Sequence, residues 1–398
     1  MKSDYELLAP VGDFKNLYAA VEAGADAVYF GIKRFNMRAN AKNFNVRDLR
    51  KVRRICGSSP RKPKMYLTLN AIVYDCELKK LEGVVKAVKG KVDAIICWDI
   101  SVIGLCKKYG VPFHISTQAS VSNVVAAKFY KGLGAERIVL ARELNLKQIK
   151  KVSRVISVEC FCHGAMCVAV SGRCFTSQFV HGISANRGQC AQPCRRIWEV
   201  KDDGGNELKL ENNRVMSAKD LCTLPFIENM KKAGIKSFKI EGRNRSPEYV
   251  STVVSEYRKA LDKKLSRGEI IKGIARLKKV YNRGFSSGFY FKMPTADDFS
   301  FSEHGEQEER KEFVGKIEKY WPKAKATSVK MFAGRLKVDD DVYLISKNAP
   351  IQRAIVKSIE FKSKNVKIAK KGQEVGVDFG IAVKRGDEVY VIKKTSQV

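Results

Sequence analysis

Short apolar runs alternate with amphipathic stretches over residues 1–245, and this alternation predicts the architecture of that part of the chain. Each run is rich in β-branched residues and almost continuously apolar, as is typical of parallel strands buried on both faces. The eight runs are Tyr5–Pro10, Asp26–Gly31, Met65–Asn70, Asp93–Trp98, Val111–Ser116, Glu136–Ala141, Ser157–Cys162 and Lys236–Glu241. Eight strands with intervening helices favour an α/β fold of the TIM type, a (β/α)8 barrel, over an open sheet.

Polar residues follow most of these runs, at the ends where a barrel of this type carries its chemistry. Any one of them could simply cap the next helix, and Asp99 is a good candidate for that role. As a set they predict an active-site rim, made of Asn70, Asp99, Ser116, Thr117, Gln118, Arg142, Glu143, His163, Glu241, Gly242 and Arg243. No Gly-x-Gly-x-x-Gly fingerprint follows the first run, which argues against a dinucleotide-binding fold.

The pattern changes towards the C-terminus. Residues 292–312 are polar and unpatterned, so we interpret them as a linker between a barrel domain, residues 1–291, and a second domain, residues 313–398. In the second domain apolar and polar residues alternate within short runs separated by turns, which predicts a small antiparallel β-barrel. Its strand-and-turn pattern resembles domain two of elongation factor Tu. Such barrels often accompany RNA-handling enzymes, an analogy at the level of fold alone.

Composition adds a strong charge to this picture. The chain has 75 basic and 42 acidic residues, a formal net charge of +33, shared between both predicted domains. A lysine-rich surface could serve solubility alone, but so large an excess also attracts polyanions, and we expect RNA as the partner. We find neither an apolar leader nor a run of the roughly 18–20 apolar residues that span a membrane. A cytoplasmic protein with no membrane partner is therefore expected.

Cysteines are concentrated between Glu159 and Cys194, a stretch that holds six of the eleven in the chain. Four glycines are interleaved with them, and tight turns at glycine allow separated thiols to converge. Soft thiolates are preferred ligands of zinc and of iron–sulfur clusters, whereas disulfides are disfavoured in a reducing compartment. A thiol nucleophile and ordinary buried cysteines remain the alternatives. The stretch follows the seventh run, so it predicts an insertion of about residues 160–222 on the catalytic face.

Several motifs together resemble one family. The run from Glu159 to Cys167 (ECFCHGAMC), followed by SGRC at Ser171–Cys174 and by Ser177, is similar to the signature of the collagenase-like peptidase family of unassigned catalytic type, family U thirty-two. Thr176 departs from it, because an aliphatic residue is usual there. Further matches, which extend the resemblance over residues 5–290, are LLAPVGDF at Leu7–Phe14, DAVYFG at Asp26–Gly31, SAKDLC at Ser217–Cys222, FKIEGR at Phe238–Arg243 and NRGFSSGF at Asn282–Phe289.

The resemblance implies more than one activity. Some members are described as collagenases or peptidases, others resemble hydroxylases of a tRNA wobble uridine or of a ribosomal RNA cytidine, and a third group takes part in ubiquinone synthesis. Resemblance to the hydroxylating members implies a 4Fe-4S cluster. Resemblance to the tRNA enzyme implies prephenate, a dicarboxylate, as co-substrate. Carried over by motif, the cluster ligands are Cys167, Cys174, Cys190 and Cys222, with Cys194 in reserve.

The residues favour RNA hydroxylation over proteolysis. We find neither a His-Glu-x-x-His nor a Gly-x-Ser-x-Gly motif, and Cys162 and His163 are neighbours that point to opposite faces of a strand. For a hydroxylase, arginines could clamp the dicarboxylate, two residues could act as acid–base groups and three aromatic residues could stack a base. These candidates are Arg38, Arg142 and Arg243, then Glu241 and His163, then Phe285, Phe289 and Tyr290. The alternatives are that the arginines contact phosphate or form surface ion pairs, that the acid–base pair serves as helix cap and buried hydrogen-bonding partner, and that the aromatic residues pack against the barrel bottom or the linker. An RNA-binding scaffold with a structural zinc remains a further alternative.

Overall fold

The computed structural model describes residues 4–167, 169–199, 201–206, 216–302, 305–322 and 326–395. Contacts within the chain divide it into two compact units, residues 1–306 and residues 307–398. Each unit is described by itself. In the described part of the chain, no helix is both long enough and apolar enough to cross a membrane.

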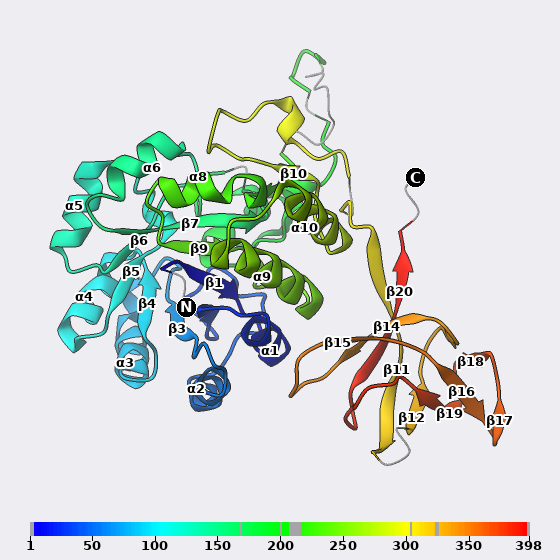
Figure 1. Ribbon diagram of the computed structural model, residues 1–398. Coiled ribbons are helices and arrows are strands. Elements are labelled where there is room, and N and C mark those ends of the chain that lie inside the picture. The colour runs from blue at the N-terminus through cyan, green and yellow to red at the C-terminus, as the bar shows by residue number, and fades with distance from the viewer. Residues whose placement is uncertain are drawn as a thin grey trace. The chain divides into compact units, whose positions relative to one another are not determined.

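Eight parallel strands of the first unit form a closed barrel (Figure 1). They are β1 (Glu6–Pro10), β2 (Ala27–Gly31), β3 (Lys64–Thr68), β4 (Ala94–Cys97), β5 (Phe113–Ile115), β6 (Arg137–Val139), β7 (Ser157–Gly164) and β9 (Ser237–Ile240). Strands β1 to β7 pair in sequence order, and β9 closes the barrel because it pairs in parallel with both β1 and β7. Every strand lies on one of the eight predicted runs, so the (β/α)8 prediction is confirmed.

Helices connect the strands and cover the outside of the barrel. They are α1 (Phe14–Glu22), α2 (Leu49–Gly57), α3 (Leu78–Val88), α4 (Ile100–Tyr109), α5 (Val124–Gly132), α6 (Leu146–Val152), α8 (Ile227–Lys232), α9 (Pro247–Asp262) and α10 (Arg267–Lys279). Side-chain caps begin several of them: Asp13 accepts from the N–H of Asn16 at 3.0 Å, and Asp99 accepts from the N–H of Ser101 at 2.9 Å. Asp99 is thus a helix cap, the alternative to a rim role that its position left open.

The expected insertion follows β7 and contains α7 (Thr176–His181) and the 3₁₀ turns η4 (Ala185–Arg187) and η5 (Pro193–Arg195). Residues 168, 200 and 207–215 of this insertion lie outside the described residues. The insertion leads into β8 (Asp220–Cys222), which runs antiparallel to the end of β7 and pairs with the short β10 (Phe285–Ser286). The remaining 3₁₀ turns are η1 (Val46–Asp48), η2 (Asp75–Glu77), η3 (Thr117–Ala119), η6 (Leu224–Phe226) and η7 (Ala296–Asp298).

The second unit is a curled antiparallel sheet around its own core, which includes Val314, Val329 and Val377. Its strands are β11 (Glu309–Trp321), β12 (Ala326–Met331), β13 (Arg335–Lys337), β14 (Asp341–Ile345), β15 (Gln352–Ile355), β16 (Ser358–Phe361), β17 (Lys364–Asn365), β18 (Ile368–Lys370), β19 (Glu374–Asp378) and β20 (Glu388–Lys394). Eight strands join in the order β15-β14-β20-β11-β12-β19-β16-β17, and β13 pairs with β18. The likeness to domain two of elongation factor Tu stays a prediction.

The structure departs from the predicted linker of residues 292–312. The first part of this segment packs on the barrel unit: the N–H of Ser300 donates to the Ser217 carbonyl at 2.7 Å, and that of Glu306 donates to Asn282 at 2.7 Å. The last part opens β11, where Glu309 pairs with Lys394 of β20. A polar composition cannot distinguish a free linker from a segment whose backbone hydrogen bonds hold it in place.

Charged residues form a network inside the barrel. Glu159 is fully buried, and its carboxylate lies 2.8 Å from Lys239 Nζ and 3.3 Å from Arg137 Nη1. Arg137 also pairs with Glu6, and Ser237 donates a hydrogen bond to that carboxylate at 3.0 Å. Burial alone would raise the pKa of Glu159, but Lys239 and Arg137 outweigh it and the pKa is lowered. The network therefore holds its carboxylates ionised.

We expect Arg137→Met to destabilise the barrel, because it leaves Glu6, whose side chain is only 14% exposed, without its cation and buried Glu159 with Lys239 alone. The free energy of unfolding at pH 7 should fall by about 3–5 kcal/mol, the usual cost of breaking a buried ion pair from one side. Urea denaturation followed by circular dichroism measures this change. Arg53→Met is the matched control: Arg53 lies 2.9 Å from Asp93, but both side chains are partly exposed, so we expect a loss of at most about 1 kcal/mol.

The pH dependence gives an independent check on Arg137→Met. Burial would raise the pKa of Glu6, but Arg137 outweighs it and lowers the pKa in the folded protein. Ionised Glu6 thus contributes stability above its ordinary pKa, and this is lost as the pH falls through the lowered value. Without Arg137 burial dominates, so the destabilisation should shrink as the pH is lowered from about 7 to about 5. An equal loss at both pH values would contradict the assignment.

Candidate functional site

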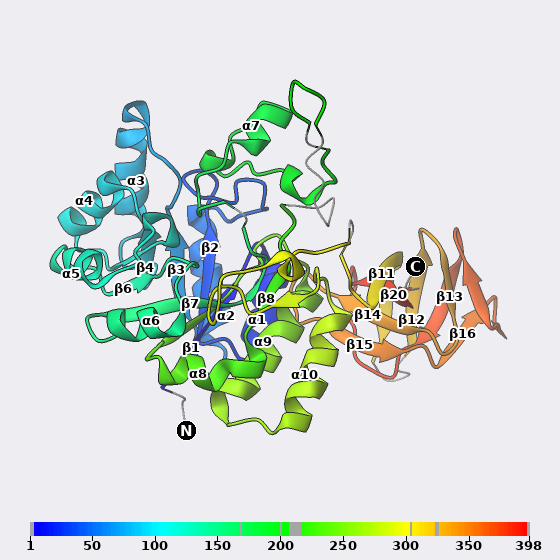
Figure 2. The ribbon, with the colours of Figure 1, turned by 90° about the horizontal axis from the view of Figure 1, so that it is seen from above.

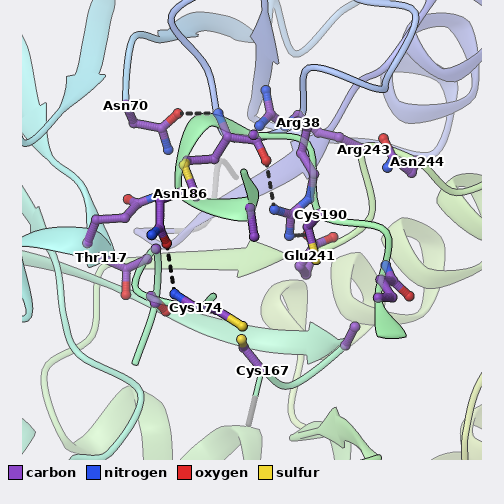
Figure 3. Close-up of a pocket in the computed structure, with 18 of the residues that line it drawn as sticks. Arg38, Asn70, Thr117, Cys167, Cys174, Asn186, Cys190, Glu241, Arg243 and Asn244 are labelled. Carbon is purple, nitrogen blue, oxygen red and sulfur yellow. Dashed lines mark hydrogen bonds and ion pairs between the residues drawn. The ribbon is translucent and has the colours of Figure 1, made fainter. Parts of the chain in front are cut away.

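A pocket opens at the carboxyl ends of the barrel strands, between the barrel and the insertion (Figure 3). Barrel residues form its floor and one side, and residues of the insertion form the other side. Residues of the predicted rim that line it are Asn70, Ser116, Thr117, Gln118, Arg142, Glu241 and Arg243. Four other members of the same prediction are not in the pocket wall: Asp99, Glu143, His163 and Gly242. The rim prediction therefore locates the pocket, although not every member reaches it.

Close backbone packing fixes the insertion on the barrel. Gly188 has φ +91°, and a Cβ there would lie 2.3 Å from the carbonyl oxygen of Asn36, so a side chain has no space. The Gly188 carbonyl in turn accepts the N–H of Ala39 at 3.0 Å. Arg187 forms a bidentate pair with Glu77 at 2.7 and 2.8 Å. The wall of the pocket is thus held against the loops that follow β2 and β3.

Arg195 connects the two ends of the insertion through hydrogen bonds to backbone carbonyls. Its guanidinium donates to the carbonyl of Met166, just after β7, and to the carbonyl of Ala218, just before β8, the latter at 2.8 Å. Arg195 is itself buried and lines the pocket. Sequence reasoning missed it, because an arginine in a loop of a basic protein gives no signal that it holds backbone carbonyls.

The pocket wall is strongly cationic. Five basic side chains line it, and Glu241 is the single carboxylate among the described lining residues; the basic ones are Arg38, Arg142, Arg195, Lys239 and Arg243. Glu241 lies 2.5 Å from Arg38 Nη2. Burial alone would raise the pKa of Glu241, but Arg38 and Arg142 outweigh it and lower the pKa. Glu241 is therefore ionised at neutral pH and could act as a base or an anchor, but not as a proton donor.

Arg142 retains unused hydrogen-bonding capacity at the pocket. Its guanidinium stacks 3.8 Å from the centroid of the Phe161 ring, and its Nη1 donates to the Ala165 carbonyl at 2.7 Å. Its Nε is buried and has no hydrogen-bond partner among the described residues. Burial lowers the pKa of Arg142, even though Glu241 raises it. A buried donor without a partner is costly, so an incoming anion would satisfy it.

Arg243 is held more tightly than Arg142. It donates to Thr68 Oγ1 at 2.9 Å and to Asn36 Oδ1 at 3.2 Å, and burial followed by the charge of Arg38 lowers its pKa to about 10. Figure 3 shows Arg38, Arg243 and Glu241 on the same side of the pocket. The guanidinium groups of Arg38 and Arg243 could therefore contact one anionic ligand together.

Four thiols line the pocket: Cys167, Cys174, Cys190 and Cys194. The N–H of Cys174 donates to Asn186 Oδ1 at 2.7 Å, and its Sγ lies 3.2 Å from the hydroxyl of Thr176. In Figure 3 the side chains of Cys167 and Cys174 point toward one another. Burial raises the pKa of Cys194, and its three neighbouring thiols raise it further. Figure 3 shows Cys190 beside Arg38 and Glu241, apart from Cys167 and Cys174. The four thiols thus line one pocket from different parts of its wall.

The predicted ligand Cys222 lies elsewhere. It is buried in β8, its Sγ is 3.8 Å from the hydroxyl of Tyr257 in α9, and burial raises its pKa to about 11. Strand β8 adds to the end of β7, so Cys222 faces the covering helix and not the pocket. Cys194, the reserve candidate, is the fourth thiol in the wall. Among the described residues no three His, Cys, Asp or Glu side chains are grouped closely enough to hold a metal ion, so the donor chemistry suits a cluster but the thiols would have to draw together.

His163 is also outside the pocket, in contrast to its predicted acid–base role. A register shift in the pairing of β7 with β9 falls between Phe161 and His163, so simple alternation does not give the direction of the side chain. The ring Nδ1 lies 3.3 Å from the hydroxyl of Tyr257, and burial lowers the pKa of His163 to about 3. His163 is a neutral, buried hydrogen-bonding partner, the alternative role for this residue.

A nucleophilic pair of Cys162 and His163 finds no support. The thiol of Cys162 donates to the carbonyl of Lys239 at 3.4 Å, and burial raises its pKa well above the ordinary value. A reactive cysteine needs a stabilised thiolate and access to substrate. Cys162 has neither, because it is fully buried and absent from the pocket wall.

The three aromatic residues predicted as a base-stacking set pack against the protein. Tyr290 donates to the carbonyl of Phe161 at 2.5 Å, the ring of Phe285 lies 5.5 Å from that of His163, and Phe289 packs on the barrel core. None of the three lines the main pocket. Their sequence pattern reflects packing around β8 and β10.

Lys239 is a pocket residue that our sequence reasoning missed. It is buried, lines the pocket floor and lies 4.5 Å from the centroid of the Tyr29 ring while it pairs with Glu159 below. Burial lowers its pKa, although Glu159 raises it. A signal was present: a lysine interrupts the apolar run of β9 at a position that alternation directs into the barrel.

Comparisons with known proteins are consistent with this architecture. The model of Peptidase family U32 matches residues 12–300. A protein of Methanocaldococcus jannaschii named as an uncharacterized protease is 38% identical, with 98% of each chain covered. A protein of Porphyromonas gingivalis named collagenase is 37% identical, with 99% of each chain covered.

A third relative has a name of a different kind. The tRNA hydroxylation protein P1 of Bacillus subtilis is 36% identical over 79% of this chain and 77% of its own. The family match extends over most of the barrel unit, and the first two relatives extend over both units. The resemblance drawn from the motifs is thereby confirmed, and the chain belongs to peptidase family U32.

Proposed function

We propose that this chain hydroxylates RNA, with tRNA as the first candidate substrate and a wobble uridine as the first candidate position. The observation that carries the proposal is the pocket itself: five cations, one ionised carboxylate and four thiols share it at the catalytic end of the barrel. Such a wall suits anionic ligands and a soft-ligand cofactor. The net charge of +33 and the relative named for tRNA hydroxylation support RNA as the polyanion.

In this proposal a small dicarboxylate such as prephenate binds to the arginines. Arg142 has a buried Nε free of partners among the described residues, and Arg38 and Arg243 lie on the same side of the pocket. Guanidinium groups match carboxylates through paired N–H donors. Glu241 is held ionised by Arg38 and could accept a proton from a reacting group nearby.

The cofactor in this proposal is a 4Fe-4S cluster, which when bound would supply electron transfer or a Lewis-acidic iron. Cys167, Cys174 and Cys190 would hold it, with Cys194 as the fourth ligand because it is the remaining thiol of the pocket wall. Cys222, which the family resemblance implies, would have to leave its contact with Tyr257 to take part. The alternative metal is a structural zinc on the same thiols.

Proteolysis is the second candidate, because the relative named collagenase aligns over both units. Within the described residues, however, the pocket wall offers no histidine to activate a thiol or hydroxyl group, and no group of side chains that holds zinc for hydrolysis. A neutral peptide would also leave the five cations without anionic partners. We therefore rank proteolysis below hydroxylation.

We expect a strain that lacks this gene to lose one hydroxylated nucleoside, because no hydroxyl group would be added to its RNA. Mass spectrometry of nucleosides from separately purified tRNA and ribosomal RNA measures the loss and identifies the RNA class. A plasmid copy of the gene should restore the nucleoside, and a copy with Arg54→Met, an exposed position on α2, should restore it equally. Unchanged nucleosides in both RNA classes, together with cleavage of denatured collagen by the purified protein, would favour proteolysis.

Iron binding should depend on the pocket thiols. After anaerobic reconstitution with iron and sulfide, we expect about four irons per chain and the broad visible absorption of thiolate-bound iron. Cys167→Ser, Cys174→Ser, Cys190→Ser and Cys194→Ser should each reduce the iron content. Cys76→Ser is the control, because Cys76 is exposed and outside the pocket. Loss in Cys222→Ser but not in Cys194→Ser would show that β8 supplies the fourth ligand, and full zinc occupancy without iron would contradict the cluster.

Dicarboxylate binding should depend on Arg142. We expect Arg142→Met to weaken prephenate binding, measured by isothermal titration calorimetry, by about 10- to 100-fold, since a charge-assisted hydrogen bond is lost. Arg142→Lys should recover only part of the affinity, because an ammonium group lacks the planar fork of a guanidinium. Equal affinity in Arg142→Met and in the surface control Arg54→Met would exclude Arg142 from the dicarboxylate site.

A further inference from the structure

Helix α7 presents two different faces at the mouth of the pocket. Thr176 and Ser177 line the pocket, and the buried hydroxyl of Ser177 accepts the N–H of Ala191 at 3.1 Å. Phe175 and Phe179 are on the outside, with 57% and 86% of their surface exposed. Four residues apart, they lie one above the other on a helical face. Figure 2 shows α7 apart from the ring of helices that surrounds the barrel.

These two phenyl rings differ from Phe129 and Phe291, two other exposed phenylalanines of the barrel unit. Phe129 lies 5.5 Å from the ring of Tyr130, and Phe291 lies 4.7 Å from that of Phe226. Among the described residues, neither Phe175 nor Phe179 has a neighbouring aromatic ring or a place in a buried cluster. Two large apolar rings in water beside a pocket indicate a surface that another molecule covers.

The surroundings indicate what kind of molecule this is. Arg173 is exposed two residues before Phe175, and its guanidinium has no hydrogen bond or ion pair within the described part of the chain. The adjoining pocket is cationic, and the whole chain carries +33. An apolar protein partner would not use this charge. Unpaired nucleotides use both features, because their bases stack on aromatic rings and their phosphates pair with arginine.

We propose that α7 is a stacking platform for unpaired RNA bases next to the nucleotide that enters the pocket. This inference rests on the proposed function, which it deepens by assigning the surface that recognises single-stranded RNA. Phe175 and Phe179 stack the flanking bases, Arg173 contacts a phosphate, and the inner face of α7 forms the pocket wall. The platform recognises unpaired bases of any sequence, because each base has a face that can stack.

Fluorescence anisotropy with a labelled RNA hairpin that carries an unpaired loop tests this platform. Phe179→Ala should weaken binding about 5- to 100-fold, the loss expected for one stacked base. Phe179→Trp should bind within about threefold of the unchanged protein, whereas Phe179→Leu, apolar but not aromatic, should lose affinity as the alanine variant does. Phe129→Ala on α5 is the matched control and should bind normally.

Several results would overturn the proposal. They are unchanged affinity in Phe179→Ala, full affinity in Phe179→Leu, an equal loss on a continuous duplex of the same stem, and failure of the unchanged protein to bind the hairpin. Arg173→Ala should lower the slope of log affinity against log salt by about one, and Phe179→Ala should leave that slope unaltered. A slope that falls equally in both variants would mean that the ring does not stack.

Failure of the stacking platform can be distinguished from failure of the proposed hydroxylation. If the unchanged protein binds the loop through Phe179 but the deletion strain keeps all its hydroxylated nucleosides, hydroxylation fails and the platform stands. If the strain loses a nucleoside while Phe179→Ala binds the hairpin normally, the platform fails and hydroxylation stands. Thermal unfolding of each variant shows whether it is folded, as expected for substitutions at exposed positions.

Discussion

The buried network around Glu159 is the constraint on which the barrel depends. Glu159 in β7 pairs with Lys239 in β9 and Arg137 in β6, and Arg137 pairs with Glu6 in β1. These four strands are consecutive around the closure of the barrel. Buried charges are tolerated when each finds its partner and costly when one does not, so the network favours the pairing that closes the barrel. The same network fixes Lys239 at the pocket floor.

The sequence was most informative where a feature depends on periodicity along the chain. Eight continuous apolar runs predicted eight buried parallel strands, and alternating runs predicted the antiparallel second unit. Short pieces were missed: β17 has two residues and β13 and β18 have three each, too few to show a period. The contacts of the predicted linker were also beyond composition, because the hydrogen bonds of Asp298, Ser300 and Glu306 to the barrel unit are made by backbone groups.

The site was predictable in its position but only partly in its members. Strand ends indicated the rim, and the cysteine spacing indicated the insertion above it. The direction of a side chain depends on features that spacing does not encode: the register shift beside His163, the added strand that turns Cys222 toward Tyr257, and the close packing of Gly188 on Asn36 that brings Cys190 and Cys194 to the wall. Motif matching selected Cys222 and strand position selected His163, but the structure places both side chains outside the pocket wall.

The electrostatics of the pocket connect its parts. Glu241 pairs with Arg38, and Glu159, beneath the pocket floor, pairs with Lys239. Arg142, Arg195 and Arg243 therefore have no carboxylate partner among the described lining residues. Arg195 donates hydrogen bonds to the backbone carbonyls at the two ends of the insertion, and Arg243 donates two hydrogen bonds, to Asn36 and Thr68. Arg142 keeps a buried donor unsatisfied, at a cost that folding alone does not recover. A site that retains this cost is suited to an anionic ligand, because such a ligand would satisfy the donor on binding.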